Sequence, residues 1–107
     1  MREISCSELA AWRADPGRIA PVVVDVREAW ELARARLDDV VHIPMNAIPS
    51  SLERLDPDAP TVCVCHHGAR SMHVAHFLER NGFSDVFNLT GGIDAWAVSH
   101  DPSVGRY

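Results

Sequence analysis

Short apolar runs rich in β-branched residues alternate along this chain with segments of helical spacing. Residues 21–25 (PVVVD) and 61–64 (TVCV) have the composition of strands that are buried on both faces of a parallel sheet. Residues 85–89 (DVFNL) predict another strand. Because each of the first two runs is followed by a polar turn and a helical pattern, we predict βαβ units. The fold class is therefore α/β, with a parallel sheet that carries helices on both faces.

The helical pattern is clearest between Ala69 and Asn81, where apolar residues recur every three or four positions. Gly82 follows that segment, and a glycine there can adopt the left-handed conformation that ends a helix, with Phe83 packing back onto the last turn. Further helices are predicted at residues 7–13, 28–34 and 50–55 and in a short segment after Gly91-Gly92.

The length of 107 residues and the hydrophobic content of 47% suffice for one core, so we predict one domain that spans residues 1–107. A turn at 56–60 (DPDAP) separates two periodic segments without dividing the chain into domains. A domain of this size buries only about 60 to 70% of the surface that its unfolded chain exposes. A large internal cavity is therefore unfavourable, and we expect a shallow active site.

The charged residues argue against nucleic acid as a partner. Fifteen acidic residues outnumber ten basic residues, the formal charge is -5, and every basic residue is an arginine. These arginines are scattered among carboxylates from Arg2 to Arg106, whereas binding to a phosphate backbone needs a clustered basic face.

Three cysteines, an odd number, are unusual for a secreted domain held by disulfides and fit reduced thiols in the cytoplasm. Residues 1–6 (MREISC) show no basic stretch followed by an apolar run, so neither a signal peptide nor a membrane span is predicted. We therefore expect a soluble cytoplasmic protein without a membrane partner.

A candidate active site follows the strand at 61–64. In the sequence VCVCHHGARS of residues 62–71, Cys65 ends the strand, a tight loop follows, and then a helix begins. Ligands of open α/β sheets bind at the carboxyl ends of strands, and the N–H groups of such a loop and helix can stabilise a negative sulfur. Gly68 permits a sharp turn, and Arg70 can present its donors to an anionic substrate. The pattern predicts that Cys65 is a nucleophile.

The spacing Cys-x-x-Gly-x-Arg-Ser at residues 65–71 resembles the active-site loop of the rhodanese family. Three other segments resemble signatures of that family, namely VVDVRE at 23–28, HIP at 42–44 and NLTGGIDAW at 88–96. The resemblance spans nearly the whole chain and implies a rhodanese-like fold with a central parallel sheet of about five strands. It also implies a sulfurtransferase in which catalytic Cys65 carries sulfane sulfur as a persulfide, without a metal or an organic cofactor. The implied substrate-binding residues are His66, His67, Gly68, Ala69, Arg70 and Ser71.

The resemblance also suggests which molecules exchange sulfur with Cys65. The doubled His66-His67 and the tail at 101–107 (DPSVGRY) are most similar to rhodanese domains fused to ubiquitin-activating-like adenylyltransferases. The implied donors are thiosulfate or a protein persulfide. The implied acceptors are a thiol, cyanide or a sulfur-carrier protein, with an adenylyltransferase as a further partner. Residues 36–39 (RLDD) depart from the His-Ile-Pro-Gly stretch of many rhodaneses, so we expect a turn of different shape there.

Two other functions stay open on the sequence alone. The same loop could dock a partner without catalysis, although non-catalytic rhodanese-like domains usually lack the cysteine that is present here. A small phosphatase or arsenate reductase would resemble Cys-x5-Arg, whereas four residues separate Cys65 from Arg70 and position 71 is Ser.

The remaining candidates have simpler interpretations. Cys63 and Cys6 are expected to be core residues, and the six histidines are not expected to form a metal site. Asp25, Arg27 and Glu28 lie where a strand ends and a helix begins, so capping and buried ion pairing are favoured over catalysis. Tryptophans are expected to pack in the core or at its edge.

Overall fold

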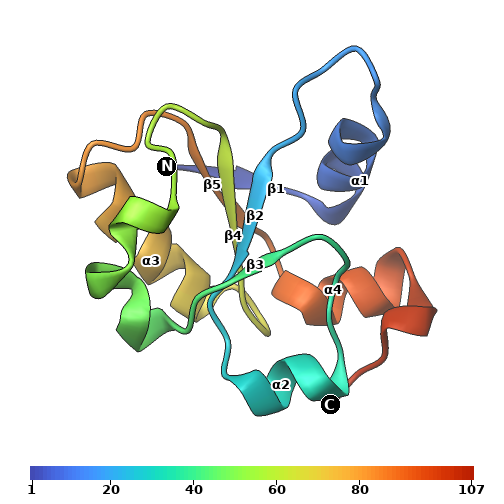
Figure 1. Ribbon diagram of the computed structural model, residues 1–107. Coiled ribbons are helices and arrows are strands. Elements are labelled where there is room, and N and C mark those ends of the chain that lie inside the picture. Colours follow the sequence, from blue (N-terminus) through green and yellow to red (C-terminus); the bar gives the residue numbers. More distant parts are fainter.

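The computed structural model describes residues 1–107 and contains five strands and four α-helices (Figure 1). The strands are β1 (Arg2–Ile4), β2 (Val22–Asp25), β3 (Val41–His42), β4 (Thr61–Val64) and β5 (Val86–Leu89). The α-helices are α1 (Cys6–Ala14), α2 (Ala29–Arg34), α3 (Ala69–Arg80) and α4 (Gly92–Ser99). Three short 3₁₀ helices complete the chain: η1 (Met45–Ser50), η2 (Leu52–Arg54) and η3 (Pro102–Val104).

All five strands are parallel, and they are hydrogen-bonded in the order β1-β5-β4-β2-β3. The central strand is β4, in which Cys63 pairs with Val24 of β2 on one side and with Asn88 of β5 on the other. The carboxyl ends of the three central strands therefore lie together, and the loops that follow them meet at one edge of the sheet. The predicted α/β class with a parallel sheet of about five strands is confirmed.

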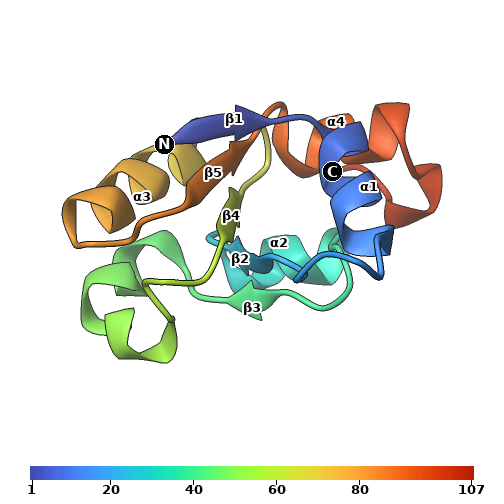
Figure 2. The same ribbon diagram turned by 90° about the horizontal axis from the view of Figure 1, so that it is seen from above.

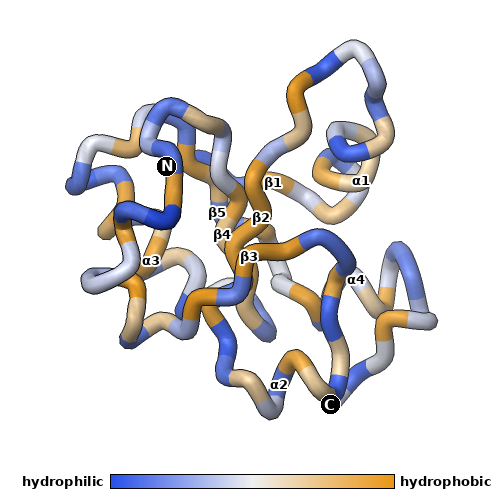
Figure 3. Tube along the Cα trace, in the orientation of Figure 1, coloured by the Kyte–Doolittle hydropathy of each residue, from blue (hydrophilic) through white to orange (hydrophobic).

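Two hydrophobic clusters pack on opposite faces of this sheet. Val62 and Val64 belong to the cluster that includes residues of α1 and α4, whereas Cys63 and Cys65 belong to the cluster that includes residues of α3 and η1. Successive residues of a strand point to opposite faces, so β4 contributes to both clusters. Figure 2 shows α3 on one side of the sheet and α1, α2 and α4 on the other. In Figure 3 the hydrophobic residues gather along the strands, as expected for a sheet covered on both faces.

The helix ends follow local rules that the sequence carries. At the start of α1, the Glu8 N–H donates to the Ser5 hydroxyl at 3.1 Å and the Ser5 N–H donates to the Glu8 carboxylate at 3.0 Å, which is a capping box. After α3, Gly82 has a φ of +91° and the Phe83 N–H donates to the Leu78 carbonyl at 3.1 Å. The predicted end of α3 at Gly82 is confirmed.

Two features differ from the predictions made from the hydropathy pattern. Strand β1 escapes the pattern because it has three residues, of which Arg2 and Glu3 are polar. Residues 50–55 lie in and after the 3₁₀ turns η1 and η2 instead of an α-helix, and Pro49 within η1 has no N–H to donate. Trp30 is 60% exposed and packs at the edge of the molecule against the Tyr107 ring, with a centroid distance of 5.9 Å.

Candidate active site

Cys65 lies directly after β4, where the strand passes into the loop that precedes α3. The residue is 1% exposed and belongs to the cluster beneath α3. Two groups lie within hydrogen-bonding distance of its sulfur: the Gly68 backbone N–H, which donates with an N–Sγ distance of 3.1 Å, and the Ser71 hydroxyl, with an Oγ–Sγ distance of 3.3 Å. The sulfur therefore lies at the base of the loop, deeper than the sequence suggests, with one amide N–H directed at it and one hydroxyl beside it.

The carbonyl groups of this loop are held by the first turn of α4. The Ile93 N–H donates to the Cys65 carbonyl at 2.9 Å, and the Asp94 N–H donates to the His66 carbonyl at 3.1 Å. This approach requires a glycine at position 92, because a Cβ there would lie 2.4 Å from the Cys65 carbonyl oxygen. With its carbonyls engaged by α4, the loop directs an N–H group toward Sγ and so favours a negative sulfur.

Asn88 of β5 holds the other side of the loop and is 1% exposed. Its Nδ2 donates to the Gly68 carbonyl at 3.1 Å and to the Glu3 carboxylate at 3.2 Å. Its Oδ1 accepts the single Ser71 hydroxyl proton at an Oγ–Oδ1 distance of 2.5 Å, so that proton is not directed at the Cys65 sulfur. Asn88 therefore positions both residues that contact the sulfur.

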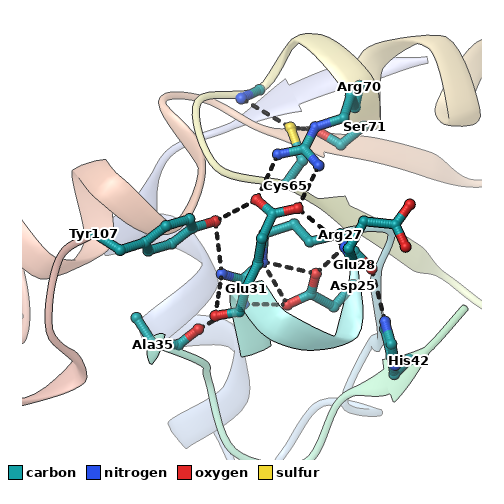
Figure 4. Close-up of polar contacts among 11 residues, drawn as sticks. Asp25, Arg27, Glu28, Glu31, Ala35, His42, Cys65, Arg70, Ser71 and Tyr107 are labelled. Carbon is teal, nitrogen blue, oxygen red and sulfur yellow. Dashed lines mark hydrogen bonds and ion pairs between the residues drawn. The ribbon is translucent and has the colours of Figure 1, made fainter. Parts of the chain in front are cut away.

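Arg70, in the first turn of α3, forms a bidentate ion pair with Glu31 of α2 (Figure 4). The Nη1–Oε1 and Nη2–Oε2 distances are 2.6 and 2.8 Å. Both terminal nitrogens of Arg70 thus face a carboxylate, whereas the sequence predicts that they face an anionic substrate. The Arg70 guanidinium, together with the Tyr107 hydroxyl, lowers the pKa of Glu31 from 4.5 to about 2. Glu31 is therefore charged at neutral pH.

A second ion pair, between Asp25 and Arg27, lies on the side of Glu31 away from Arg70 (Figure 4). Both side chains are fully buried, and Arg27 donates to the two Asp25 oxygens through Nε at 2.9 Å and Nη2 at 2.8 Å. Further bonds from Arg27 reach the Tyr107 hydroxyl at 2.9 Å and the Ala35 carbonyl at 2.7 Å. The predicted buried ion pair is confirmed, and it joins the end of β2 to the helix that carries Glu31.

The two imidazole rings lie on the outer side of the loop. The His66 ring stacks between the rings of Tyr107 and His67, with centroid distances of 4.1 and 4.0 Å. Burial lowers the pKa of His66 below its usual 6.5, and the His67 side chain is 67% exposed. Ala69 is exposed at the start of α3. The structure thus brings the loop backbone to the sulfur, whereas no hydrogen bond joins either imidazole to Cys65.

The other two cysteines are buried, as predicted. Burial, with a smaller contribution from the neighbouring Cys65, raises the pKa of Cys63 to about 12. Burial also raises the pKa of Cys6 above its usual 9.0. Neither thiol is therefore readily ionised near neutral pH. No three His, Cys, Asp or Glu side chains are grouped so that they could hold a metal ion. None of the helices has the length and apolar content that crossing a membrane requires.

Residues 5–99 match the rhodanese-like domain. The chain belongs to this family. One relative, a putative sulfurtransferase of Bacillus subtilis named YtwF, is 43% identical over 80 residues, which are 75% of this chain and 77% of the relative. Another, the thiosulfate sulfurtransferase GlpE of Pseudomonas entomophila, is 33% identical over 99 residues, which are 92% of this chain and 87% of the relative.

Larger proteins also contain a segment similar to this rhodanese-like domain. The chain is 34% identical over 112 residues to a chloroplastic rhodanese-like/PpiC domain-containing protein of Arabidopsis thaliana, but it spans only 38% of that protein. Among solved structures, a rhodanese-like domain protein of Staphylococcus aureus has a TM-score of 0.84 at 32% identity, covering 94% of this chain and 95% of that chain. The predicted family and fold are confirmed, and the predicted class of activity agrees with the names of the relatives.

Three residues that support the loop of this rhodanese-like domain are not among the site residues predicted from the sequence: Glu31, Asn88 and Tyr107. Glu31 follows Glu28 by three positions, and the Glu28 N–H donates to the Glu31 carboxylate at 3.0 Å. That capping pattern at a helix start is a signal that could have identified Glu31. Asn88 is a polar residue inside a predicted strand, which is also a detectable signal. Tyr107 has no local signal, because it reaches Glu31 across 76 positions of the chain.

Proposed function

We propose that this rhodanese-like domain is a sulfurtransferase in which Cys65 carries a sulfane sulfur atom as a persulfide. The strongest support is the Gly68 N–H, which is directed at the Cys65 sulfur at 3.1 Å just before the start of α3. Such a donor favours the thiolate, which is the nucleophilic form of cysteine. The sulfurtransferase names of the Bacillus and Pseudomonas relatives support the same class of reaction.

The proposed reaction has two halves. In the first, the Cys65 thiolate attacks the outer sulfur of thiosulfate, a new S–S bond forms at Cys65, and the S–S bond of the donor breaks with its electron pair leaving on sulfite. In the second, cyanide or a thiolate attacks the outer sulfur of the persulfide, and the Cys65 thiolate is the leaving group. The Gly68 N–H stabilises the anionic sulfur in both halves because it is already in place.

The other loop residues shape access to this sulfur in the proposal. His66, His67 and Ala69 form the outer wall of the loop, and Arg70 faces the donor with the N–H groups that Glu31 leaves free. Donors of this chemistry are thiosulfate or a protein persulfide. Acceptors are a thiol, cyanide or a sulfur-carrier protein, and an adenylyltransferase that activates such a carrier is a further proposed partner.

The reaction also makes demands on the chain and on its surroundings. We propose that residues 1–107 act as one domain, because both hydrophobic clusters pack on the same sheet. Three free cysteines fit a reducing compartment such as the cytoplasm.

Intact-protein mass spectrometry tests the proposal. After treatment with thiosulfate and removal of excess donor, the protein should carry one additional sulfur atom, and cyanide should remove it as thiocyanate. Cys65→Ser should gain no sulfur, whereas Cys63→Ala and Cys6→Ala, which each remove one buried thiol, should load normally. Loading of Cys65→Ser at the wild-type level would overturn the proposal.

The two alternative functions give different results in the same samples. Hydrolysis of a phosphate ester that depends on Cys65, without sulfur loading, would identify a phosphatase. Partner capture that is equal in the wild type and in Cys65→Ser, again without sulfur loading, would identify a docking module.

A further inference from the structure

The positive charges of the arginines around the loop are compensated by carboxylates. Three arginines are each bonded to a carboxylate: Arg27 to Asp25, Arg70 to Glu31 and Arg106 to Asp94. Members of all three pairs lie close enough to His66, the residue after Cys65, to act on its pKa, namely Asp94, Glu31 and Arg27. None of the three arginines therefore offers an uncompensated positive charge to a donor that approaches Cys65.

Among these arginines, Arg70 follows Cys65 by five positions, in the first turn of α3, and Figure 4 draws both side chains at this end of the site. Its electrostatic neighbours include both Glu31, which raises the Arg70 pKa most, and Cys65. The Arg70 side chain is 37% exposed, whereas that of Glu31 is only 5% exposed. A donor can therefore reach the Arg70 guanidinium from solvent, but the buried Glu31 carboxylate already compensates the charge of that guanidinium.

The carboxylate of Glu31 is held in this position by four donors. Two come from Arg70, one is the Tyr107 hydroxyl at 2.6 Å, and one is the Glu28 N–H at 3.0 Å. Swinging Glu31 away to free Arg70 would break all of these bonds and leave a buried carboxylate without partners, which is costly. The ion pair is thus a fixed property of the site rather than a contact that a donor easily displaces.

We infer that Glu31 is a specificity-determining residue: by neutralising Arg70, it lowers the preference of the site for doubly charged sulfur donors relative to singly charged or neutral ones. This inference rests on the proposed function. At equal distance, a single positive charge attracts a dianion twice as strongly as a monoanion, and a carboxylate beside that charge cancels most of the difference. The site then discriminates little by donor charge, so that organic thiosulfonates and persulfides compete with inorganic thiosulfate as donors.

Two donors of different charge test the inference. Thiosulfate carries two negative charges and methanethiosulfonate carries one, yet each transfers one outer sulfur to Cys65 and releases sulfite or methanesulfinate. The quantity to measure is the ratio of kcat/KM for thiosulfate to kcat/KM for methanethiosulfonate at low ionic strength. Glu31→Gln removes the charge and keeps the size of the side chain, so this ratio should rise about three- to tenfold. Arg70→Gln leaves Glu31 uncompensated, so the ratio should fall.

Tyr107→Phe is the matched control, because it removes a hydrogen bond to Glu31 without changing any charge. A loss of packing or loop order would slow both donors together, so the ratio should stay at the wild-type value in this variant. An unchanged ratio in Glu31→Gln, or an equal rise in Tyr107→Phe, would overturn the inference.

The wild type provides a second measurement in case Glu31→Gln does not fold. If Glu31 neutralises Arg70, the ratio of kcat/KM for thiosulfate to kcat/KM for methanethiosulfonate should change little as salt is added. If the Arg70 charge were uncompensated, this ratio would fall steeply, because salt would screen the stronger attraction of Arg70 for the dianion. A steep fall in the wild type would also refute the inference. If neither donor loads wild-type Cys65, the proposed function itself fails; if both load, only the role of Glu31 is under test.

Discussion

Replacing Gly92 by alanine should disrupt the sulfur site from outside the loop. The added Cβ would lie 2.4 Å from the Cys65 carbonyl oxygen and 2.5 Å from the His66 carbonyl oxygen, so the loop and the start of α4 must move apart. That movement breaks the hydrogen bonds that the Ile93 and Asp94 N–H groups donate to these carbonyls at 2.9 and 3.1 Å. The Gly68 N–H would then no longer be held toward the sulfur.

The expected loss of stability is the sum of two effects. Gly92 has a φ of +61°, and a residue with a Cβ in the left-handed region costs about 1 to 2 kcal/mol. Each lost hydrogen bond contributes about 1 kcal/mol. The free energy of unfolding should therefore fall by about 3 to 4 kcal/mol, a large part of the roughly 5 to 15 kcal/mol that is typical of a small domain.

Urea denaturation and sulfur loading together check this prediction. Gly82→Ala is the matched control, because Gly82 also has a positive φ, +91°, but a Cβ there meets no atom within 4 Å. Gly82→Ala should cost only the backbone strain, about 1 to 2 kcal/mol, and should load sulfur at the wild-type rate under conditions where it is folded. The reasoning is refuted if the two variants unfold at the same urea concentration, or if folded Gly92→Ala loads sulfur as fast as the wild type.

Two further predictions concern the ion pairs. Asp25→Asn should lower the free energy of unfolding by about 3 to 5 kcal/mol, because it leaves the buried Arg27 charge without its carboxylate. Asp94→Asn, which removes the carboxylate that is paired with the exposed Arg106, should lower the free energy of unfolding much less; equal urea midpoints for the two variants would contradict this. Because the pKa of Glu31 is lowered from 4.5 to about 2, its ionised form contributes stability that is fully present above pH 4.5 and is lost as the pH falls toward 2. Unfolding of Glu31→Gln should be less sensitive to pH in that window, and an identical acid profile in both proteins would argue against the pairing.

The parts of the fold that sequence reasoning predicts are those whose signal is local. Residues of β2 and β4 are β-branched because both faces of these strands are buried, so the runs are visible without any knowledge of their neighbours. Cys65 and the helix that follows it are predictable for the same reason, because the whole loop from strand to helix lies within residues 62–71. Strand β1 is not predictable in this way, because its extended structure depends on pairing with β5 and not on its own composition.

The residues that contact the loop are distant from it in sequence, so their contacts are not predictable from a local pattern. Arg70 meets Glu31 across 39 positions, and Asn88 meets Gly68 across 20. Whether Arg70 faces a substrate or a carboxylate depends on where α2 packs relative to α3, which no local pattern encodes. The residue types of the site are therefore readable from the sequence, whereas its electrostatic balance is a tertiary property.

The residues that stabilise the sulfur are supported by different elements from the residue that affects the choice of donor. The first turn of α4 holds the loop carbonyls, Asn88 holds Gly68 and Ser71, and Glu31 holds Arg70. Each of these supports comes from a different element. The groups that contact the sulfur can therefore stay in place when the carboxylate that compensates the Arg70 charge is removed. A substitution at Glu31 should then alter which donors react while the persulfide, once formed, passes to its acceptor as before. The same is not true of Asn88 or Gly92, because their contacts determine the direction of the groups that stabilise every anionic sulfur in the cycle.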